Sequence, residues 1–416
     1  MADRIVIVGA GHAAVQLAAS LRQEGHEGPI TMIGDEPGLP YQRPPLSKAY
    51  MKDGDPDRLI LKPESFFEKN DIDRRESTRV VSVDRSARCV VIEDGERLDY
   101  DHLVLATGAR NMRPPIEGAD HESVVELRSL AHAMDIRERL EKAKRAIVVG
   151  GGFIGLEFAA MAEAAGVSTT VIEAGPRLMA RAVSPAISER FLTHHRASGT
   201  TVLLDAAATK ISAPEGGAAD TVSLADGSEI EGDLVLVATG VRPNSELAAE
   251  SGLEVGNGIV VDEGLASDDL AISAIGDCAA VPGPLGAHQR LESVQAATDQ
   301  ARHLAKRLMG KADGGYSAVP WFWSDQGSLK LQIAGLTAHA DSWHVIGEAD
   351  TVIGFREGRL VSVETVNQPG PHMAARKLLA LEEIPSRDDV AAAGFDLRAL
   401  SKGEANTRLQ ASTASG

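Results

Sequence analysis

Two stretches of the chain share one order of apolar and polar positions: a short apolar run, a glycine-rich turn, and an amphipathic segment. In the first stretch, the apolar run "IVIV" predicts a strand over residues 4–8 that is covered on both faces. Residues 12–24 follow with helical periodicity, and one face carries Ala14, Leu17, Ala18 and Leu21. A second strand is expected at 30–34.

The second stretch repeats this order from residue 145 onward. "RAIVVGGG" predicts a strand and a turn, 153–165 a helix, and "TTVIEA" the next strand. Each stretch closes on a buried strand that ends in "ATG", at 102–110 and at 232–244. We therefore expect an α/β fold with an internal repeat, in which two Rossmann-like dinucleotide-binding domains follow each other.

The remaining chain departs from this repeat. The proline-punctuated stretch 40–48 predicts a loop, 270–279 a strand, and 293–310 a helix. After Trp321 the pattern alternates, as in "LKLQIAGL" and "RLVSVETV", and indicates a C-terminal α+β domain. The expected organisation therefore comprises four parts: a discontinuous first domain at 1–113 and 243–320, a second at 114–242, an α+β domain at 321–403, and a disordered tail at 404–416.

Composition narrows the class of protein. The net charge of −18 argues against nucleic-acid or membrane-surface binding. The N-terminus enters a strand almost at once and no run of 18 apolar residues occurs, so we expect a cytoplasmic protein without a signal peptide or a membrane span. Cys89 and Cys278 form no C-x-x-C pair and are expected to be buried structural thiols. The histidines lack metal-ligand spacing, so no protein-bound metal is expected.

The first glycine turn has the form G-x-G-x-x-A, with Gly9, Gly11 and Ala14. The first glycine permits a tight turn and the second permits close approach of a pyrophosphate, while a small third residue lets the helix pack on the strand. The helix N-terminus adds N–H donors and a favourable dipole. An acid after the second strand is suited to bind a ribose; Asp35 is favoured here and Glu36 is the alternative.

The second turn has the full form G-x-G-x-x-G, with Gly150, Gly152 and Gly155. Glu173 ends the following strand, where a carboxylate binds the ribose hydroxyls and repels a 2′-phosphate, which predicts NADH over NADPH. Arg177 nearby leaves NADPH open. Two cradles imply two dinucleotides, as in an electron relay from a nicotinamide to a flavin.

The motifs GAGHAA, "LVLATGAR", "GGGFIGLE", "VATGVRPN" and "AIGDCA" occur in the order of a known family. The chain resembles the pyridine nucleotide-disulfide oxidoreductase superfamily, which has the glutathione-reductase fold. "YQRPPLSK" and "PWFWSDQ" are similar to its oxygenase-coupled ferredoxin reductase branch, of the putidaredoxin reductase and dioxygenase ferredoxin reductase type. That resemblance implies that electrons pass from NADH through FAD to a [2Fe–2S] ferredoxin, which feeds a haem monooxygenase or a Rieske dioxygenase.

The resemblance also implies roles for single residues. Lys48 would lie beside the flavin, and Glu157 would pair with it and line the nicotinamide slot, so these two are the candidate catalytic residues. The implied FAD contacts are Gly9, Gly11, His12, Ala13, Ala14, Asp35, Glu36, Arg43, Lys48, Val81, Ala106, Thr107, Gly108, Arg128, Gly276, Asp277, Glu292, Ser293, Val294 and Trp323. The implied NAD contacts are Gly150, Gly152, Phe153, Ile154, Gly155, Glu157, Glu173, Ala238, Thr239 and Gly240.

The acceptor presents an electrostatic problem, because such ferredoxins are usually acidic and this chain is acidic too. A local basic patch could overcome the repulsion within the screening length of about 8–10 Å. The helix "VQAATDQARHLAKRLMG" offers Arg302, Lys306 and Arg307, and Lys330 follows. We expect Arg302, Lys306 and Lys330 to dock the partner; a solvated helix face is the alternative explanation. The enzyme itself is expected to be a monomer or a weak homodimer.

Other functions remain to be weighed. A disulfide reductase would need a redox cysteine pair near the flavin, and a single-cysteine peroxidase would need a cysteine near the PPLSK-type loop; neither occurs. A rubredoxin reductase differs only in its acceptor and stays open. An NADH-sensing flavoprotein similar to apoptosis-inducing factor is the non-enzymatic alternative.

Overall fold

The computed structural model describes residues 3–213, 220–283 and 286–403. The chain falls into two compact units, each built from separate stretches. Over the described residues, the first unit comprises 3–45, 55–110 and 241–318, and the second comprises 46–54, 111–240 and 319–403. The expected disordered tail at 404–416 lies outside the described residues.

A parallel five-stranded sheet forms the centre of the first unit, in the order β20-β7-β1-β2-β3. Its strands are β1 (Ile5–Val8), β2 (Ile30–Ile33), β3 (Ile72–Arg75), β7 (His102–Leu105) and β20 (Ile272–Ala274). All four residues of β1 and of β7 are buried, because helices and loops cover both faces of a parallel sheet. Helix α1 (His12–Gln23) packs against α8 (Val294–Leu308), and Ala14, Leu17, Ala18 and Leu21 are fully buried, as predicted.

Two smaller sheets complete this unit. The three-stranded antiparallel sheet contains β4 (Val80–Asp84), β5 (Cys89–Ile92) and β6 (Arg97–Asp99). The four-stranded sheet contains β18 (Val255–Gly256), β19 (Gly258–Val260), β21 (Ala279–Pro282) and β22 (His288–Arg290). The short helices are η2 (Pro56–Leu59), α3 (Glu64–Lys69), α7 (Glu246–Glu250) and η3 (Gly276–Cys278). Both cysteines are buried and free, as predicted.

The second unit repeats the parallel design in the order β12-β11-β10-β16-β9. Its strands are β9 (Val124–Val125), β10 (Arg145–Val149), β11 (Ser168–Ile172), β12 (Thr201–Leu203) and β16 (Leu234–Val237). Its helices are α4 (Leu130–Leu140), α5 (Phe153–Ala164) and α6 (Pro185–Ala197). An antiparallel sheet adds β13 (Ala208–Ser212), β14 (Asp220–Leu224) and β15 (Glu229–Gly232). The short strands β8 (Ala109–Asn111) and β17 (Val241–Pro243) lie where the chain passes between the units.

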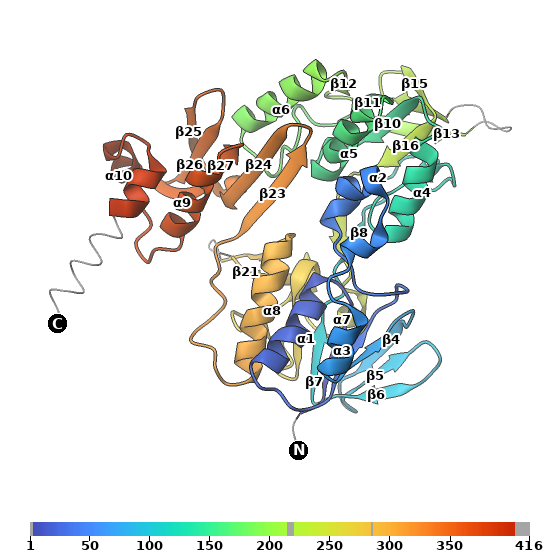
Figure 1. Cartoon of the computed structure of the whole chain (residues 1–416), viewed down its shortest axis with the longest axis vertical. Coiled ribbons are helices and arrows are strands. Elements are labelled where there is room, and N and C mark those ends of the chain that lie inside the picture. Colours follow the sequence, from blue (N-terminus) through green and yellow to red (C-terminus); the bar gives the residue numbers. More distant parts are fainter. Residues whose placement is uncertain (1–2, 214–219, 284–285, 404–416) are drawn as a thin grey trace. The chain divides into compact units, whose positions relative to one another are not determined.

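The C-terminal part of the second unit is the predicted α+β structure (Figure 1). Its antiparallel sheet has the order β23-β24-β27-β26-β25, with α9 (Pro369–Leu379) packed on β24 and β27. The strands are β23 (Trp321–Gln326), β24 (Leu329–Gly335), β25 (Ser342–Ile346), β26 (Thr351–Arg356) and β27 (Arg359–Val366). The helices η4 (Thr337–His339) and α10 (Arg387–Ala392) complete it. Among the described helices, none is long and apolar enough to cross a lipid bilayer.

Two expectations about local structure were wrong. The stretch 40–48 is not all loop, because η1 (Pro44–Ser47) forms within it and α2 (Ala49–Asp53) follows at once. Proline is tolerated in a first helical turn, where its missing N–H has no helical partner to lose. The strand expected at 270–279 is limited to β20, because Gly276 turns the chain with a φ of +77° into η3.

Candidate functional site

The first glycine of each cradle packs against the "ATG" turn of its own unit. Gly9 has a φ of +125°, and a Cβ there would lie 2.1 Å from the Ala106 carbonyl oxygen. Gly150 has a φ of +114°, and its Cβ would lie 2.4 Å from the Ala238 carbonyl oxygen. Only glycine avoids both the clash and the strain. The two "ATG" turns that define the internal repeat are therefore the packing partners of the two glycine loops.

The second glycine of each cradle stands at an open position. Gly11 and Gly152 are the N-caps of α1 and α5, and a Cβ on either would meet nothing within 4 Å. Neither helix has a side-chain cap hydrogen bond, so its first N–H groups are left to another acceptor. This arrangement fits the pyrophosphate of a dinucleotide at each helix N-terminus.

The third position differs between the units. Ala14 is accommodated in α1 with its side chain fully buried. At Gly155, a Cβ would lie 2.3 Å from the Gly150 carbonyl oxygen, so α5 requires glycine there. The helix of the second unit thus lies closer to its own glycine loop.

Several other predicted residues gather around the first cradle. A Cβ on Gly276 would contact the Ala13 side chain at 3.1 Å, and the Gly276 N–H donates to the Gln300 side chain at 2.7 Å. His12 begins α1; burial, with a contribution from the Arg43 charge, lowers its pKa to about 4, while Asp277 opposes the shift. His12 is therefore a neutral imidazole at physiological pH.

The two acids after β2 differ in their surroundings. The Glu36 carboxylate pairs with the Arg43 guanidinium and accepts from the Tyr41 hydroxyl. Asp35 is exposed. Glu36 and Arg43 thus hold each other at this edge of the first unit, while the Asp35 carboxylate faces solvent.

The "ATG" turn of the first unit is held by a residue that the sequence analysis did not select. Asn244 donates to the Thr107 carbonyl oxygen at 2.8 Å, and the Thr107 hydroxyl donates to the Asn244 carbonyl oxygen at 2.5 Å. The Asn244 N–H also donates to the Gly108 carbonyl oxygen at 2.9 Å. Asn244 ends the quoted motif "VRPN", and that position was the only signal in the sequence.

The helix α8 supplies the remaining predicted residues of this unit. Ser293 caps α8 by accepting from the Ala296 N–H at 3.0 Å, and Val294 is its first residue. Glu292 pairs with Arg290 at 2.5 Å. Val81 lies on β4 and is exposed.

Of the docking candidates on α8, Lys306 is exposed and Arg302 pairs with Asp299 at 3.2 Å. Arg307, considered with them, instead donates to the Ser273 hydroxyl at 2.6 Å and is half-buried. Arg307, which was not among the predicted docking residues, is thus engaged within the first unit. Lys330 is exposed on β24, in the second unit.

Three of the predicted FAD contacts also belong to the second unit: Lys48, Arg128 and Trp323. Lys48 lies beside Glu157, with 3.0 Å between Nζ and Oε1. The Lys48 ammonium also lies 6.0 Å from the centre of the Trp323 ring and 3.9 Å from the Asp325 carboxylate. The predicted pair of Lys48 and Glu157 is thus formed, and its side chains are 18% and 6% exposed.

Glu157 has two further partners that the sequence analysis missed. Ser47 donates to its Oε2 at 2.6 Å and Ser324 donates to its Oε1 at 2.6 Å. Each serine is adjacent to a residue that had been selected, Lys48 and Trp323 respectively. Phe153, at the start of α5, contacts Phe322 with 4.6 Å between ring centres and the rings tilted by 41°, which packs β23 against α5.

Glu173 holds the second glycine loop. Its Oε2 accepts from the Gly151 N–H and its Oε1 from the Gly175 N–H, both at 2.7 Å. Arg177 donates instead to the carbonyl oxygens of Ala180 and Val183, at 2.6 and 2.8 Å. The carboxylate after β11 is therefore fixed by main-chain donors, and the nearby guanidinium is held by its own loop.

The second "ATG" turn is tied to the stretch that enters this unit. The Thr239 hydroxyl donates to the Met112 carbonyl oxygen at 3.0 Å, and the Met112 N–H donates to the Gly240 carbonyl oxygen at 2.8 Å. Ile154 occupies the first turn of α5 and is half-buried.

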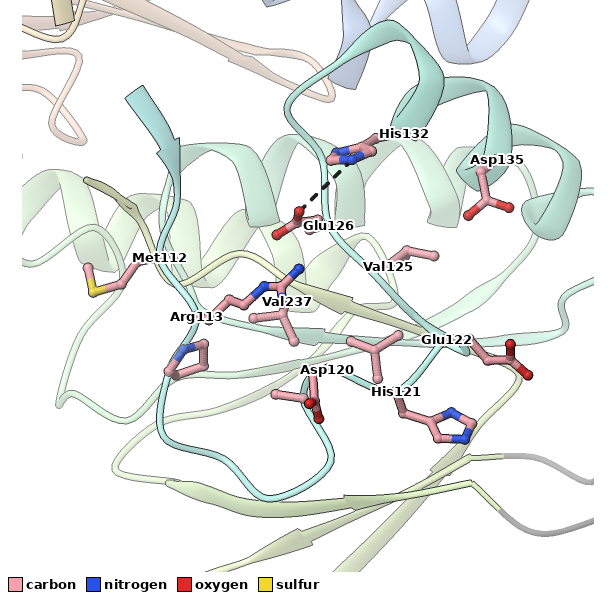
Figure 2. Close-up of a pocket in the computed structure, with 13 residues that line it drawn as sticks. Met112, Arg113, Asp120, His121, Glu122, Val125, Glu126, His132, Asp135 and Val237 are labelled. Atoms are coloured by element: carbon pink, nitrogen blue, oxygen red, sulfur yellow. Dashed lines mark ion pairs between the residues drawn. The ribbon is translucent and has the colours of Figure 1, made fainter. Parts of the chain in front are cut away.

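A separate cavity of about 240 Å³ lies in the second unit (Figure 2). Its lining combines apolar side chains with charged ones and two histidines, and Glu126 Oε1 lies 3.9 Å from His132 Nε2. None of its lining residues belongs to the glycine loop or to the Lys48–Glu157 pair. Across the described residues, no group of three or more acidic, histidine or cysteine side chains has a geometry that could hold a metal ion.

Comparison with known proteins places these features in a family. The family model described as pyridine nucleotide-disulphide oxidoreductase matches residues 3–301, and that described as reductase C-terminal matches 321–401. Rhodocoxin reductase of Rhodococcus erythropolis is 48% identical, over 95% of this chain and 93% of its own. Rubredoxin-NAD(+) reductase of Pseudomonas putida is 40% identical, over 88% of this chain and 96% of its own.

Two solved structures share the fold of the whole chain. The ferredoxin reductase for the CYP199A2 system of Rhodopseudomonas palustris has a TM-score of 0.91 and 45% identity, and covers 95% of this chain and 99% of its own. The covalent putidaredoxin reductase–putidaredoxin complex has a TM-score of 0.91 and 33% identity, and covers 96% of this chain and 98% of its own. The chain belongs to the pyridine nucleotide-disulphide oxidoreductase family, and it is an oxidoreductase that uses FAD and NAD(H).

Proposed function

We propose that this protein is an NADH-dependent reductase that delivers electrons to a [2Fe–2S] ferredoxin serving a cytochrome monooxygenase or a Rieske dioxygenase. The observation that carries the proposal is the presence of two dinucleotide cradles in a chain whose two cysteines are both buried, in β5 and η3. Without a redox dithiol, reducing equivalents cannot leave through a disulfide. They leave instead to an external acceptor.

FAD belongs to the first cradle in this proposal. When bound, FAD supplies the conversion between a two-electron hydride donor and a one-electron acceptor. The α1 N-terminus at Gly11 and His12 would hold its pyrophosphate. The exposed Asp35 would bind the ribose, since the Glu36 carboxylate already has Arg43 and Tyr41 as partners. The further proposed FAD contacts, carried over from the family resemblance, are Gly9, Ala13, Ala14, Lys48, Val81, Ala106, Thr107, Gly108, Arg128, Gly276, Asp277, Glu292, Ser293, Val294 and Trp323.

NADH belongs to the second cradle. The fixed carboxylate of Glu173 would accept from the ribose hydroxyls and repel a 2′-phosphate. The alternative that Arg177 admits NADPH is disfavoured because its guanidinium is engaged by the carbonyl oxygens of its own loop. The further proposed NAD contacts are Gly150, Gly152, Phe153, Ile154, Gly155, Ala238, Thr239 and Gly240.

Lys48 and Glu157 would act by charge and position, without exchanging a proton with substrate. A cation at Lys48 stabilises negative charge that develops on a neighbouring redox ring, and the electrostatic effect is large where water is excluded. Glu157 orients that cation at 3.0 Å and would line the slot for the nicotinamide. The main contribution of the chain is the alignment of donor and acceptor.

The domain roles follow from the same proposal. Residues 1–113 and 243–320 would form the FAD domain, 114–242 the NAD domain, and 321–403 the C-terminal domain. The segment 46–54 nevertheless packs within the compact unit of the NAD residues, and this brings Lys48 to Glu157.

Docking of the ferredoxin would use exposed cations against a net charge of −18. Arg302 and Lys306 on α8 and Lys330 on β24 are the proposed docking residues, and all three are exposed. Such charges raise the rate of encounter more than they raise affinity. The proposed enzyme is a monomer or a weak homodimer.

A rubredoxin is the second candidate acceptor, because a rubredoxin reductase is 40% identical to this chain. The cradles serve either acceptor equally, so only the docking surface would differ. An NADH-sensing flavoprotein is the non-enzymatic alternative, and a slow, long-lived charge-transfer complex after NADH addition would favour it over the reductase.

An anaerobic titration tests the proposal. NADH should bleach the flavin absorbance of the purified protein. An oxidised [2Fe–2S] ferredoxin should then restore this absorbance rapidly, as followed in a stopped-flow instrument. Recovery with rubredoxin but not with ferredoxin would transfer the assignment to the second candidate. A reduced state that persists with both acceptors and decays only with oxygen would refute the relay.

A further inference from the structure

A continuous line of buried hydrogen bonds ends on Glu157. The His195 ring nitrogen Nε2 lies 2.9 Å from Gln326 Oε1. Gln326 Nε2 donates to Ser324 Oγ at 3.1 Å, and Ser324 Oγ donates to Glu157 Oε1 at 2.6 Å. Ser324 and Gln326 are fully buried and His195 is 1% exposed. The line joins α6, β23 and α5 within the second unit (Figure 1).

The donors in this line all point toward the carboxylate. Gln326 Oε1 can only accept, so His195 presents an N–H from Nε2. Burial lowers the pKa of His195, which agrees with a neutral ring that serves as a donor. The amide of Gln326 then donates to Ser324, whose hydroxyl hydrogen is directed to Glu157. Bonds aligned in this way polarise one another and strengthen the last donation.

Two further contacts hold the Glu157 carboxylate. Ser47 donates to Oε2 at 2.6 Å, and the Lys48 ammonium lies 3.0 Å from Oε1. Both carboxylate oxygens are therefore engaged from different directions. A carboxylate held in this way cannot rotate about its terminal torsion without breaking a charge-assisted hydrogen bond.

The motif "WSDQ" places two polar residues, Ser324 and Gln326, at the two buried positions of β23. Residues two apart in a strand share a face, so Ser324 and Gln326 both point toward α5 and α6. Burying a serine and a glutamine is unfavourable unless both find partners. Here their partners are the candidate catalytic glutamate and a histidine, rather than each other's main chain.

We propose that Ser324, Gln326 and His195 are positioning residues that orient the Glu157 carboxylate toward the nicotinamide end of NADH. This inference rests on the proposed role of Glu157 in the nicotinamide slot. It assigns to the C-terminal sheet a direct part in nicotinamide positioning, through a strand that otherwise packs by its aromatic side chains.

The test compares two ligands on the FAD-loaded protein by calorimetry. One is a tetrahydro analogue of NADH, which retains the nicotinamide ring but cannot donate a hydride; the other is ADP-ribose, which lacks that ring. Ser324→Ala should weaken binding of the analogue up to about tenfold, because a Glu157 carboxylate that has lost this donor is less well oriented toward the ligand. Binding of ADP-ribose should stay within about twofold. Stopped-flow reduction by saturating NADH should also slow.

Ser362→Ala is a matched control. Ser362 lies on β27 of the same sheet and is also fully buried, and its Oγ has no hydrogen-bond partner among the described residues. Ser362→Ala should leave the binding of both ligands unchanged. Gln326→Met removes the hydrogen bonds to Ser324 and His195, one step farther from Glu157. It should also weaken binding of the analogue, but by a smaller factor than Ser324→Ala. It provides the test if Ser324→Ala does not fold.

Glu157→Gln separates this inference from the proposed function. If Glu157→Gln weakens binding of the analogue and Ser324→Ala does not, the positioning role of Ser324 is overturned and the role of Glu157 stands. If neither variant affects the analogue, both roles are overturned, while ferredoxin reduction by the wild-type protein still measures the relay. Equal effects of Ser324→Ala and Ser362→Ala, or equal weakening of both ligands, would show general damage to the sheet and overturn the inference.

Discussion

Glu364 on β27 should make the stability of the C-terminal sheet depend on pH. Its side chain is 1% exposed, and its Oε1 accepts from the Ser184 N–H at 2.8 Å. Its Oε2 is buried without a hydrogen-bond partner in the described chain. Burial raises the pKa of Glu364 from its ordinary value of 4.5 to about 7, although the contacts with Ser184 oppose the shift. The folded protein therefore holds a proton on Glu364 that the unfolded chain releases at a lower pH.

The sign of the effect follows from this difference. Well below pH 4.5 both states are protonated, and the charge of Glu364 has no effect on stability. The destabilisation grows as the pH rises and is complete above about 7. At 1.36 kcal/mol per pH unit, the displacement from 4.5 to about 7 corresponds to about 3 kcal/mol. Glu364→Gln keeps the shape and removes the charge. Relative to wild type, its free energy of unfolding should be about 1 kcal/mol higher at pH 5 and up to about 3 kcal/mol higher at pH 8.

The assay can report on this sheet selectively. All three tryptophans of the chain, Trp321, Trp323 and Trp343, lie on β23 and β25, so their fluorescence during urea unfolding follows the C-terminal part. The control is Glu357→Gln, whose side chain is 84% exposed. The reasoning would be refuted if the difference in free energy of unfolding between Glu364→Gln and wild type were the same at pH 5 and pH 8. It would also be refuted if Glu357→Gln showed the same pH dependence.

Three further predictions follow from the cradles and the docking residues. Gly9→Ala should reduce the FAD content of the purified protein and cost more than about 2 kcal/mol, because its Cβ would lie 2.1 Å from the Ala106 carbonyl oxygen. The control is Gly25→Ala, where φ is +93° and an added Cβ would meet nothing within 4 Å. This variant should be destabilised by backbone strain alone and should retain flavin. Equal flavin loss in both variants would contradict this account. Glu173→Ala should raise the KM for NADH about tenfold and narrow its preference over NADPH, measured with ferricyanide as acceptor; an unchanged ratio of the two kcat/KM values would count against the ribose role. Arg302→Glu should raise the apparent KM for ferredoxin and spare ferricyanide reduction, and an equal loss in both assays would remove Arg302 from the docking surface.

Much of the site could be predicted from sequence because its signals are local. A glycine loop between an apolar strand and a helix needs only about fifteen consecutive residues to be recognised, and its geometry follows from backbone sterics. For this reason the bounds of β1 and α1, and of β10 and α5, match the predicted elements closely. The prediction of a loop at 40–48 was wrong because prolines usually indicate a break in regular structure, whereas a helical turn forms at Pro44–Ser47.

The partners of the catalytic candidates could not be predicted in the same way. Ser324 lies 167 residues from Glu157 and Ser47 lies 110 residues from it, so no periodicity connects them. Arg307 on α8 donates to Ser273 on β20, 34 residues earlier in the chain, and the helical pattern alone did not indicate this contact. Such choices depend on which elements meet in the folded chain.

The amino-acid sequence by itself therefore determined the two nucleotide-binding repeats, the acid after each second strand, the separate C-terminal part, and the family. These features are encoded by residues close together in the chain, where steric limits and hydrophobic periodicity act directly. Only the tertiary structure decided that the segment of Lys48 packs with the second unit, that β23 reaches Glu157, and that Glu364 is buried with an unsatisfied oxygen. The physical reason is that burial and long-range hydrogen bonds are properties of packed elements, and a short stretch of sequence does not contain its packing partners.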